Sequence, residues 1–122
     1  MDIRSILGRS GERESERFLR RKGYRIVCRN YRRPPGEIDL IALDGKIVVF
    51  VEVKTRADAE HADPQDAVTP DKQKRIGDCA RWFLRETDSE ERACRFDVLA
   101  LVQQPDGSYQ FEHFVEAFVP HD

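Results

Sequence analysis

The sequence predicts an α/β domain in which a helix, three strands, a second helix and two further strands follow one another. Two segments carry apolar residues at helical spacing, other segments carry them at strand spacing, and turn-forming residues stand between the segments. A chain of 122 residues can bury one hydrophobic core, so we expect residues 1–122 to form a single domain.

The first helix is predicted to begin at Ser10 and to end at Gly23, a residue type common at helix ends. Its inward stripe is formed by residues at helical spacing, which are Gly11, Ser15, Phe18, Leu19 and Lys22. Strand-forming residues over 24–32 predict the first strand, and the Arg-Pro-Pro-Gly sequence at 33–36 predicts a turn.

A β-hairpin is predicted over residues 37–55. The runs EIDLIAL at 37–43 and KIVVFVEVKT at 46–55 are strand-like, and Asp44-Gly45 between them is typical of a two-residue turn. With this turn, Leu43 pairs with Lys46, Asp39 with Phe50, and Glu37 with Glu52. The period of two then places four charged residues on one face at the open end of the hairpin. These residues are Glu37, Asp39, Glu52 and Lys54.

The second half of the chain is predicted to contain an exposed loop, a helix and two strands. The polar loop covers residues 56–68, and Thr69-Pro70-Asp71 is typical of a helix start. The buried stripe of this helix consists of Ile76, Cys79, Ala80, Phe83 and Leu84, with Trp82 outside it. Strands are expected over 95–102 and 109–119, with a turn at 105–107.

Charge is distributed unevenly along the chain. The net charge is -2, yet the residues up to Gly36 include eleven Lys and Arg against four Asp and Glu. A basic surface of this kind can bind phosphates, for which Arg13, Arg32 and Arg33 are candidates. Charge alone is equally compatible with solvated faces of helices and strands.

The sequence contains no sign of a membrane segment or of a disulfide framework. Its longest uninterrupted apolar run is Ile47 to Val51, and its three cysteines lack CxxC spacing. No apolar signal-like stretch stands at the N-terminus. We therefore expect a cytoplasmic protein that does not bind membranes.

The carboxylates on the hairpin face require compensation, because like charges crowded on one face of a sheet destabilise it. Mg²⁺ or Mn²⁺ bound by Asp39 and Glu52 would supply it and is suited to phosphodiester hydrolysis, with Lys54 orienting the attacking water. Glu37 is open between a ligand, an acceptor for a metal-bound water and a turn residue. A surface ladder of ion pairs is the alternative for the whole group.

Other polar residues have less specific interpretations. Lys72 on the inward stripe and Arg56 on the active face could contact phosphates, whereas Lys74 and Arg75 are expected in solvent. Asp97 interrupts an apolar strand, so we expect it to be a structural hydrogen-bond partner, with Arg95 as one candidate donor. The histidines lack ligand spacing and are expected at the surface; they are His61, His113 and His121.

The acidic residue Asp39 followed on the next strand by Glu52-Val53-Lys54 resembles the motif of the PD-(D/E)XK nuclease superfamily. More specifically, GEIDLIALDG followed by VFVEVKTR resembles the YraN-like family of small bacterial proteins related to Holliday junction resolvases. The segments GRSGERESERFLRRKGYRIVCRNYR and CRFDVLAL extend the resemblance over nearly the whole chain. It implies a restriction-endonuclease-like core, with a mixed central sheet flanked by helices in the order αβββαββ.

The resemblance also implies functional roles. Asp39 and Glu52 correspond to metal ligands, Lys54 to the catalytic lysine, and Glu12 to a helix glutamate near the metal, although Glu12 could equally be a surface residue that complements the helix dipole. The implied activity is Mg²⁺- or Mn²⁺-dependent cleavage of DNA, with branched or structured DNA as the substrate class. A homodimer would allow both strands to be cut symmetrically.

Two further interpretations compete with the nuclease. The same fold could bind nucleic acid or a partner without cutting it, because fold does not determine function. The second competing interpretation is a metal-binding protein without affinity for nucleic acid. Pro34-Pro35, Ser15 and the surroundings of His61 depart from the usual family pattern, which affects loop geometry and substrate preference more than the metal site.

Overall fold

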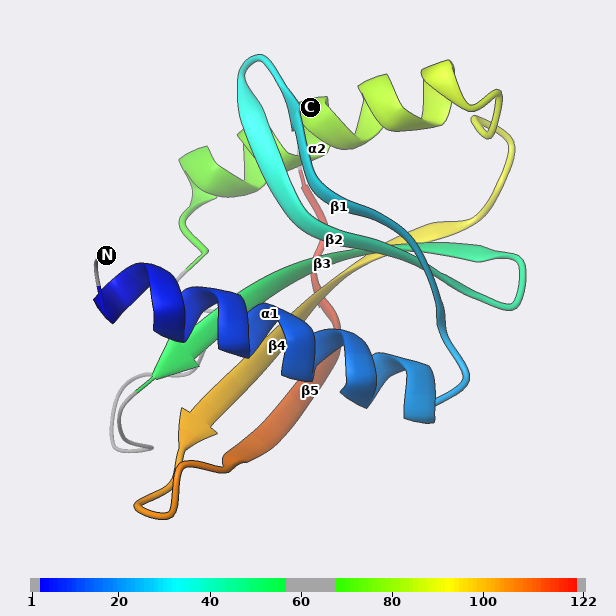
Figure 1. Cartoon of the computed structure of the whole chain (residues 1–122). Coiled ribbons are helices and arrows are strands. Elements are labelled where there is room, and N and C mark those ends of the chain that lie inside the picture. The colour runs from blue at the N-terminus through cyan, green and yellow to red at the C-terminus, as the bar shows by residue number, and fades with distance from the viewer. Residues whose placement is uncertain (1–2, 57–67, 121–122) are drawn as a thin grey trace.

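A five-stranded sheet with helices packed against it forms the framework of the protein (Figure 1). The computed structural model describes residues 3–56 and 68–120. Most of the loop expected over 56–68 therefore lies outside the described residues. The elements are α1 (Ile3–Arg21), β1 (Arg25–Arg33), β2 (Gly36–Asp44), β3 (Ile47–Arg56), α2 (Pro70–Glu86), β4 (Cys94–Gln103) and β5 (Tyr109–Phe118).

The sheet is mixed, as the resemblance implies. Its strands lie in the spatial order β1-β2-β3-β4-β5. Neighbouring strands are antiparallel except β3 and β4, which are parallel and are joined in sequence through α2. The order αβββαββ and this sheet are consistent with a restriction-endonuclease-like core.

The two helices cover opposite faces of the sheet (Figure 1). Leu19 of α1 packs with side chains such as Leu99, whereas Ile76 and Cys79 of α2 pack with another cluster that includes Phe50. Trp82 lies outside the buried stripe of α2 with 44% of its surface exposed, as predicted. Neither described helix has the apolar length that a bilayer span requires.

The prediction for α1 was wrong at the beginning of the helix, whereas Gly23, with a φ of 92°, ends it as predicted. The helix begins at Ile3 instead of Ser10, so Ser10 lies within the helix and not at its start. It ends at Arg21, and Lys22 is exposed beyond it instead of lying on the buried stripe. The predicted inward residues Gly11, Ser15 and Leu19 are buried.

The register of the β2–β3 hairpin differs from the predicted one by two residues. Asp44 pairs with Ile47, so the turn consists of Gly45 and Lys46, and Leu43 pairs with Val48 instead of Lys46. Gly45 has a φ of 60°, the left-handed conformation that glycine supplies at the first position of type II′ turns. Because two residues are one full period of a strand, the shift in register does not itself turn any side chain to the other face.

Strand β2 changes the orientation of its side chains near Asp39. Leu40 packs in the cluster on the α1 side of the sheet, but Ile38 packs in the cluster on the α2 side. On the neighbouring strand, Asn30 has a φ of 48°, and the pairing on either side of it is Arg29 with Leu40 and Tyr31 with Ile38. The two strands therefore twist together at this point, and the β1–β2 hairpin curls toward α2 (Figure 1).

A buried polar network joins β4 and β5. Asp97 is fully buried and accepts hydrogen bonds from His113 Nε2 at 2.7 Å, the Glu116 amide at 3.0 Å and Arg95 Nε at 3.1 Å. The structural role expected for Asp97 is confirmed. The surface position expected for His113 is wrong, because its side chain is 2% exposed and its Nδ1 accepts from Lys22 Nζ at 2.8 Å. His61 and His121 lie outside the described residues.

Replacing Asp97 with Asn should destabilise the protein by roughly 3 kcal/mol at neutral pH, because buried donors lose a charged partner. Burial alone would raise the pKa of Asp97, but its hydrogen bonds from His113, Glu116 and Arg95 together lower it below its ordinary value. The carboxylate therefore contributes full stability above about pH 4, and this is lost as the pH falls through the lower folded pKa. Urea unfolding of the wild type and of Asp97→Asn at neutral and acidic pH measures the difference in their free energies of unfolding. An equal loss of stability in both proteins on acidification would contradict the prediction.

Candidate active site

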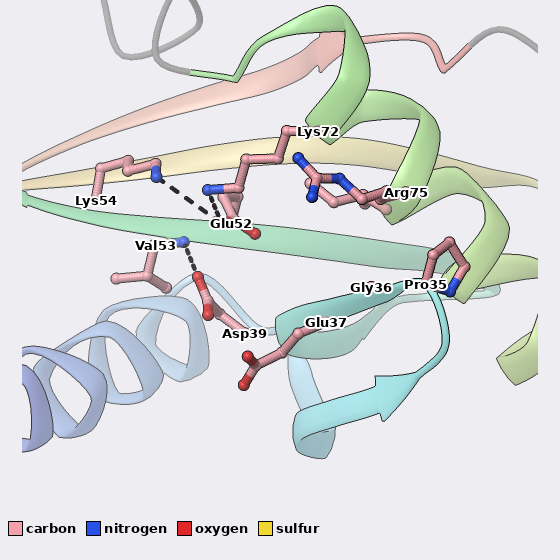
Figure 2. A pocket seen from close by; sticks show the side chains of 10 residues that line it. Pro35, Gly36, Glu37, Asp39, Glu52, Val53, Lys54, Lys72 and Arg75 are labelled. Carbon is pink, nitrogen blue, oxygen red and sulfur yellow. Dashed lines mark hydrogen bonds and ion pairs between the residues drawn. The ribbon is translucent and has the colours of Figure 1, made fainter.

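An open pocket of about 540 Å³ lies between β2, β3 and the start of α2 (Figure 2). It contains all four charged residues that the hairpin pattern predicts on one face, although their register was wrong. Ten residues line it: Pro35, Gly36, Glu37, Asp39, Glu52, Val53, Lys54, Lys72, Arg75 and Ile76. The pocket therefore combines carboxylates with cationic side chains from two parts of the chain.

Asp39 lies on β2 directly beyond Leu40, which forms with Val51 the last backbone pair between β2 and β3. Its Oδ2 accepts a hydrogen bond from the amide of Val53 at 2.8 Å, which directs the carboxylate toward β3 (Figure 2). Burial and then the charge of Glu52 raise the pKa of Asp39 to about 6, against the lowering effect of the Val53 amide. A nearby positive ligand would offset both causes of the increase.

Glu52 is the most deeply buried carboxylate of the pocket, with 7% of the residue exposed. Its Oε1 accepts from Lys72 Nζ at 2.8 Å and lies 3.9 Å from Lys54 Nζ. Its Oε2 is buried without a hydrogen-bond partner among the residues that the structure describes. An unsatisfied buried carboxylate oxygen is costly, so this atom calls for a cation or a donor.

The pKa values of the two lysines of the pocket, Lys54 and Lys72, shift in opposite directions. Figure 2 shows both of them directed toward Glu52. Burial and then the proximity of Lys72 lower the pKa of Lys54. For Lys72, burial alone would lower the pKa, but hydrogen bonds with Glu52 and Lys54 raise it. Lys54 is therefore the lysine that gives up its proton more readily.

The donor set suits a hard divalent cation. Among residues 3–56 and 68–120, no group of three or more His, Cys, Asp and Glu side chains is arranged to hold a metal ion. Mg²⁺ needs only one or two protein carboxylates, because it keeps several of its waters. Asp39 and Glu52 supply two carboxylates, and the unpartnered Oε2 of Glu52 supplies a buried oxygen that lacks a positive partner.

The remaining predicted acidic residues lie further from this pair. Glu37 lines the pocket but forms an ion pair with Arg32 at 3.2 Å, and its side chain is 40% exposed. Glu12 is half-buried on α1 and is not part of the pocket lining. Its neighbour Gly11 packs against β3, where an added Cβ would lie 2.9 Å from Thr55 Oγ1. Helix α1 therefore crosses β3 near its C-terminal end, at Thr55.

The predicted phosphate-binding arginines Arg13, Arg32 and Arg33, whose side chains are described, do not line the pocket. Arg33 donates to both carboxylate oxygens of Glu86, at 2.7 and 2.8 Å. Arg13 is exposed on α1, and Arg32 is held by Glu37. The side chain of Arg56 lies outside the described residues, so only its place at the end of β3 is defined. Of the residues predicted to bind phosphate whose side chains are described, Lys72 is the one that lines the pocket.

Arg75 is exposed, as expected, but it also lines the open pocket one helical turn after Lys72, which sequence reasoning missed. The three-residue spacing between them is the signal that could have identified it. Gly36 was also missed: a Cβ there would lie 2.6 Å from the carbonyl oxygen of Arg75. The tip of the β1–β2 hairpin thus contacts the backbone of α2, beside Pro35 (Figure 2).

Known proteins resemble this chain over most of its length. The model of a family described as "Uncharacterised protein family UPF0102" matches residues 11–101. A UPF0102 protein of Chlorobium limicola is 45% identical over 117 residues, covering 92% of this chain and 91% of the relative. Another from Desulfosudis oleivorans is 47% identical over 110 residues, covering 90% and 89%. A third, from Symbiobacterium thermophilum, is 45% identical over 112 residues, covering 92% and 95%.

Replacing Lys72 with Met should lower the free energy of unfolding by about 2 kcal/mol, because Glu52 loses its closest cation while remaining buried. The value is below that of a fully buried pair, since one third of the Lys72 side chain is exposed. Adding Glu52→Gln should restore part of the loss. Urea unfolding of the single and double variants measures the coupling, with exposed Lys74→Met as the control. Additive effects of the two substitutions would contradict the pairing.

Proposed function

The chain belongs to the UPF0102 family, and we propose that it is a metal-dependent endonuclease that hydrolyses phosphodiester bonds in DNA. The observation that carries the proposal is the buried Oε2 of Glu52, which has no partner among residues 3–56 and 68–120 and lies in an open pocket shared with Asp39. A cation at this oxygen would relieve the cost of its burial and the repulsion between the two carboxylates.

The chemistry follows from the residues of the pocket. Asp39 and Glu52 would hold Mg²⁺ or Mn²⁺, which supplies Lewis-acid polarisation of a phosphoryl oxygen and acidification of water. The Val53 amide fixes the Asp39 carboxylate in its orientation. Lys54, whose pKa is lowered, is suited to orient the attacking water and to accept its proton.

The cationic residues of the pocket are suited to binding the substrate. Lys72 and Arg75 lie on one side of the pocket, on α2, where they can bind the charged oxygens of a phosphodiester. Lys72 would then exchange part of its interaction with Glu52 for one with the substrate. This arrangement supports a polyanionic substrate, and the family resemblance favours branched or structured DNA.

A second candidate function is supported by the contact between Lys72 and Glu52. At 2.8 Å, the ammonium already neutralises one oxygen of Glu52 and could replace a metal ion electrostatically. The protein would then bind nucleic acid through the same pocket without cutting it. This candidate predicts DNA affinity that divalent cations do not increase.

Cleavage assays with Mg²⁺ or Mn²⁺ should show activity on at least one member of a set of linear, nicked, flapped and four-way-junction DNAs. The substitutions Asp39→Asn, Glu52→Gln and Lys54→Met should each reduce the rate by about a hundredfold or more, because each removes a charge next to the reacting phosphate. Glu112→Gln, which alters an exposed carboxylate of β5, should leave the rate unchanged. A wild-type protein that binds these DNAs but cuts none of them would favour the second candidate.

Mn²⁺ should raise the melting temperature of the protein in the absence of DNA, because the ion binds the folded pocket. At a free concentration of roughly one hundred times Kd, the stabilisation should be about 2.7 kcal/mol. The shift should disappear in Glu52→Gln and persist in Glu112→Gln. An equal shift in wild type and Glu52→Gln would show that the ion binds elsewhere.

A further inference from the structure

A second hollow, of about 300 Å³, lies beside the candidate active site on the outer side of α2. It is lined by Pro35, Asp78, Arg81, Trp82 and Arg85. Trp82 is 44% exposed, and the guanidinium carbon of Arg85 lies 5.8 Å from the centre of its ring. The hollow therefore combines a partly exposed aromatic ring with a cation beside it.

This hollow and the active-site pocket share a lining residue and lie along the same helix. Pro35 lines both of them, at the tip of the hairpin that contacts α2. Along α2, Arg75 and Trp82 are seven residues apart and return to one face of the helix. Lys72 and Arg85 lie roughly 60° to either side of that pair, so the four side chains follow an oblique path around the helix. We call these four residues the Trp82 track. From Lys72 to Trp82 the helix rises by roughly 15 Å, enough for a few nucleotides of one strand.

The composition of the Trp82 track matches a single strand of nucleic acid. Three of its four side chains are cations that can follow a phosphate backbone, and the acidic Asp78 beside them is paired with Arg81 at 3.5 Å. The ring of Trp82 offers a face on which an unpaired base can stack. Bases within a duplex are stacked on one another and cannot reach such a ring unless they are unpaired.

We propose that the Trp82 track binds unpaired nucleotides next to the phosphodiester that is cleaved, with one base stacked on Trp82. The inference rests on the proposed nuclease function and specifies its substrate class as DNA in which a single-stranded segment adjoins a duplex. Flaps, forks and gapped duplexes have this form, whereas a continuous blunt duplex does not.

The test uses the fact that Trp82 is the single tryptophan of the chain. In EDTA, which prevents cleavage, a short oligothymidylate should quench its fluorescence in a saturable and salt-dependent manner. Fluorescence anisotropy with a fluorescein-labelled flap DNA should show roughly tenfold weaker binding for Trp82→Ala than for the wild type. This is the loss of affinity expected when the stacking of one base is removed. Arg85→Ala should also weaken binding, Trp82→Phe should retain most of it, and Lys74→Ala should leave it unchanged.

Binding and cleavage distinguish failure of this inference from failure of the nuclease proposal. If oligothymidylate quenches Trp82 and Trp82→Ala weakens flap binding, the track is supported, even when no DNA is cut with Mg²⁺ or Mn²⁺. If Glu52-dependent cleavage occurs but Trp82→Ala binds and cuts flap and blunt duplex as the wild type does, the track is overturned while the nuclease stands. Absence of quenching, or equal wild-type affinity for flap and blunt duplex, also overturns it.

Discussion

The hydrogen bond from the Val53 amide to Asp39 is the interaction on which the candidate active site depends. It lies just beyond the paired residues Leu40 and Val51, so a side chain takes over the connection between β2 and β3 that backbone groups provide along the ladder. The bond holds a carboxylate against the strand that also carries Glu52. Near Asp39, where the strands twist, regular backbone pairing between β2 and β3 ends and the polar pocket begins. The packing of the rest of the sheet against both helices stabilises this local distortion.

The electrostatics of the pocket explain why binding and catalysis are closely related possibilities for this protein. Two carboxylates raise each other's energy when charged, and Lys72 compensates one oxygen of Glu52 while the other stays without a partner in the described part of the chain. A metal ion and a phosphate would redistribute these charges between them, because the first attracts the carboxylates and the second attracts the lysines. The pocket therefore presents groups of both charges, which is the feature that the proposed metal ion and phosphate would use.

The sequence predicted the elements and the shared face of the charged residues, because both depend on local periodicity. The face survived the register error since a shift of two residues preserves the side to which each side chain points. The register itself could not be derived locally: Asp44 is held in the strand by Arg95, 51 residues away, at 3.0 Å. His113 was misplaced for the same reason, because its partner Asp97 lies on a different strand.

The glycine at the tip of the β1–β2 hairpin has a consequence for how the protein meets its substrate. Gly36 lies so close to the carbonyl oxygen of Arg75 that no Cβ could stand between them without displacement. One edge of the entrance is therefore framed by two main chains, and no rotamer change can widen it there. Such a frame acts as a rigid template. If the substrate is DNA, as proposed, this edge cannot adapt to it, so DNA that is already bent, frayed or interrupted would bind at the lowest energetic cost.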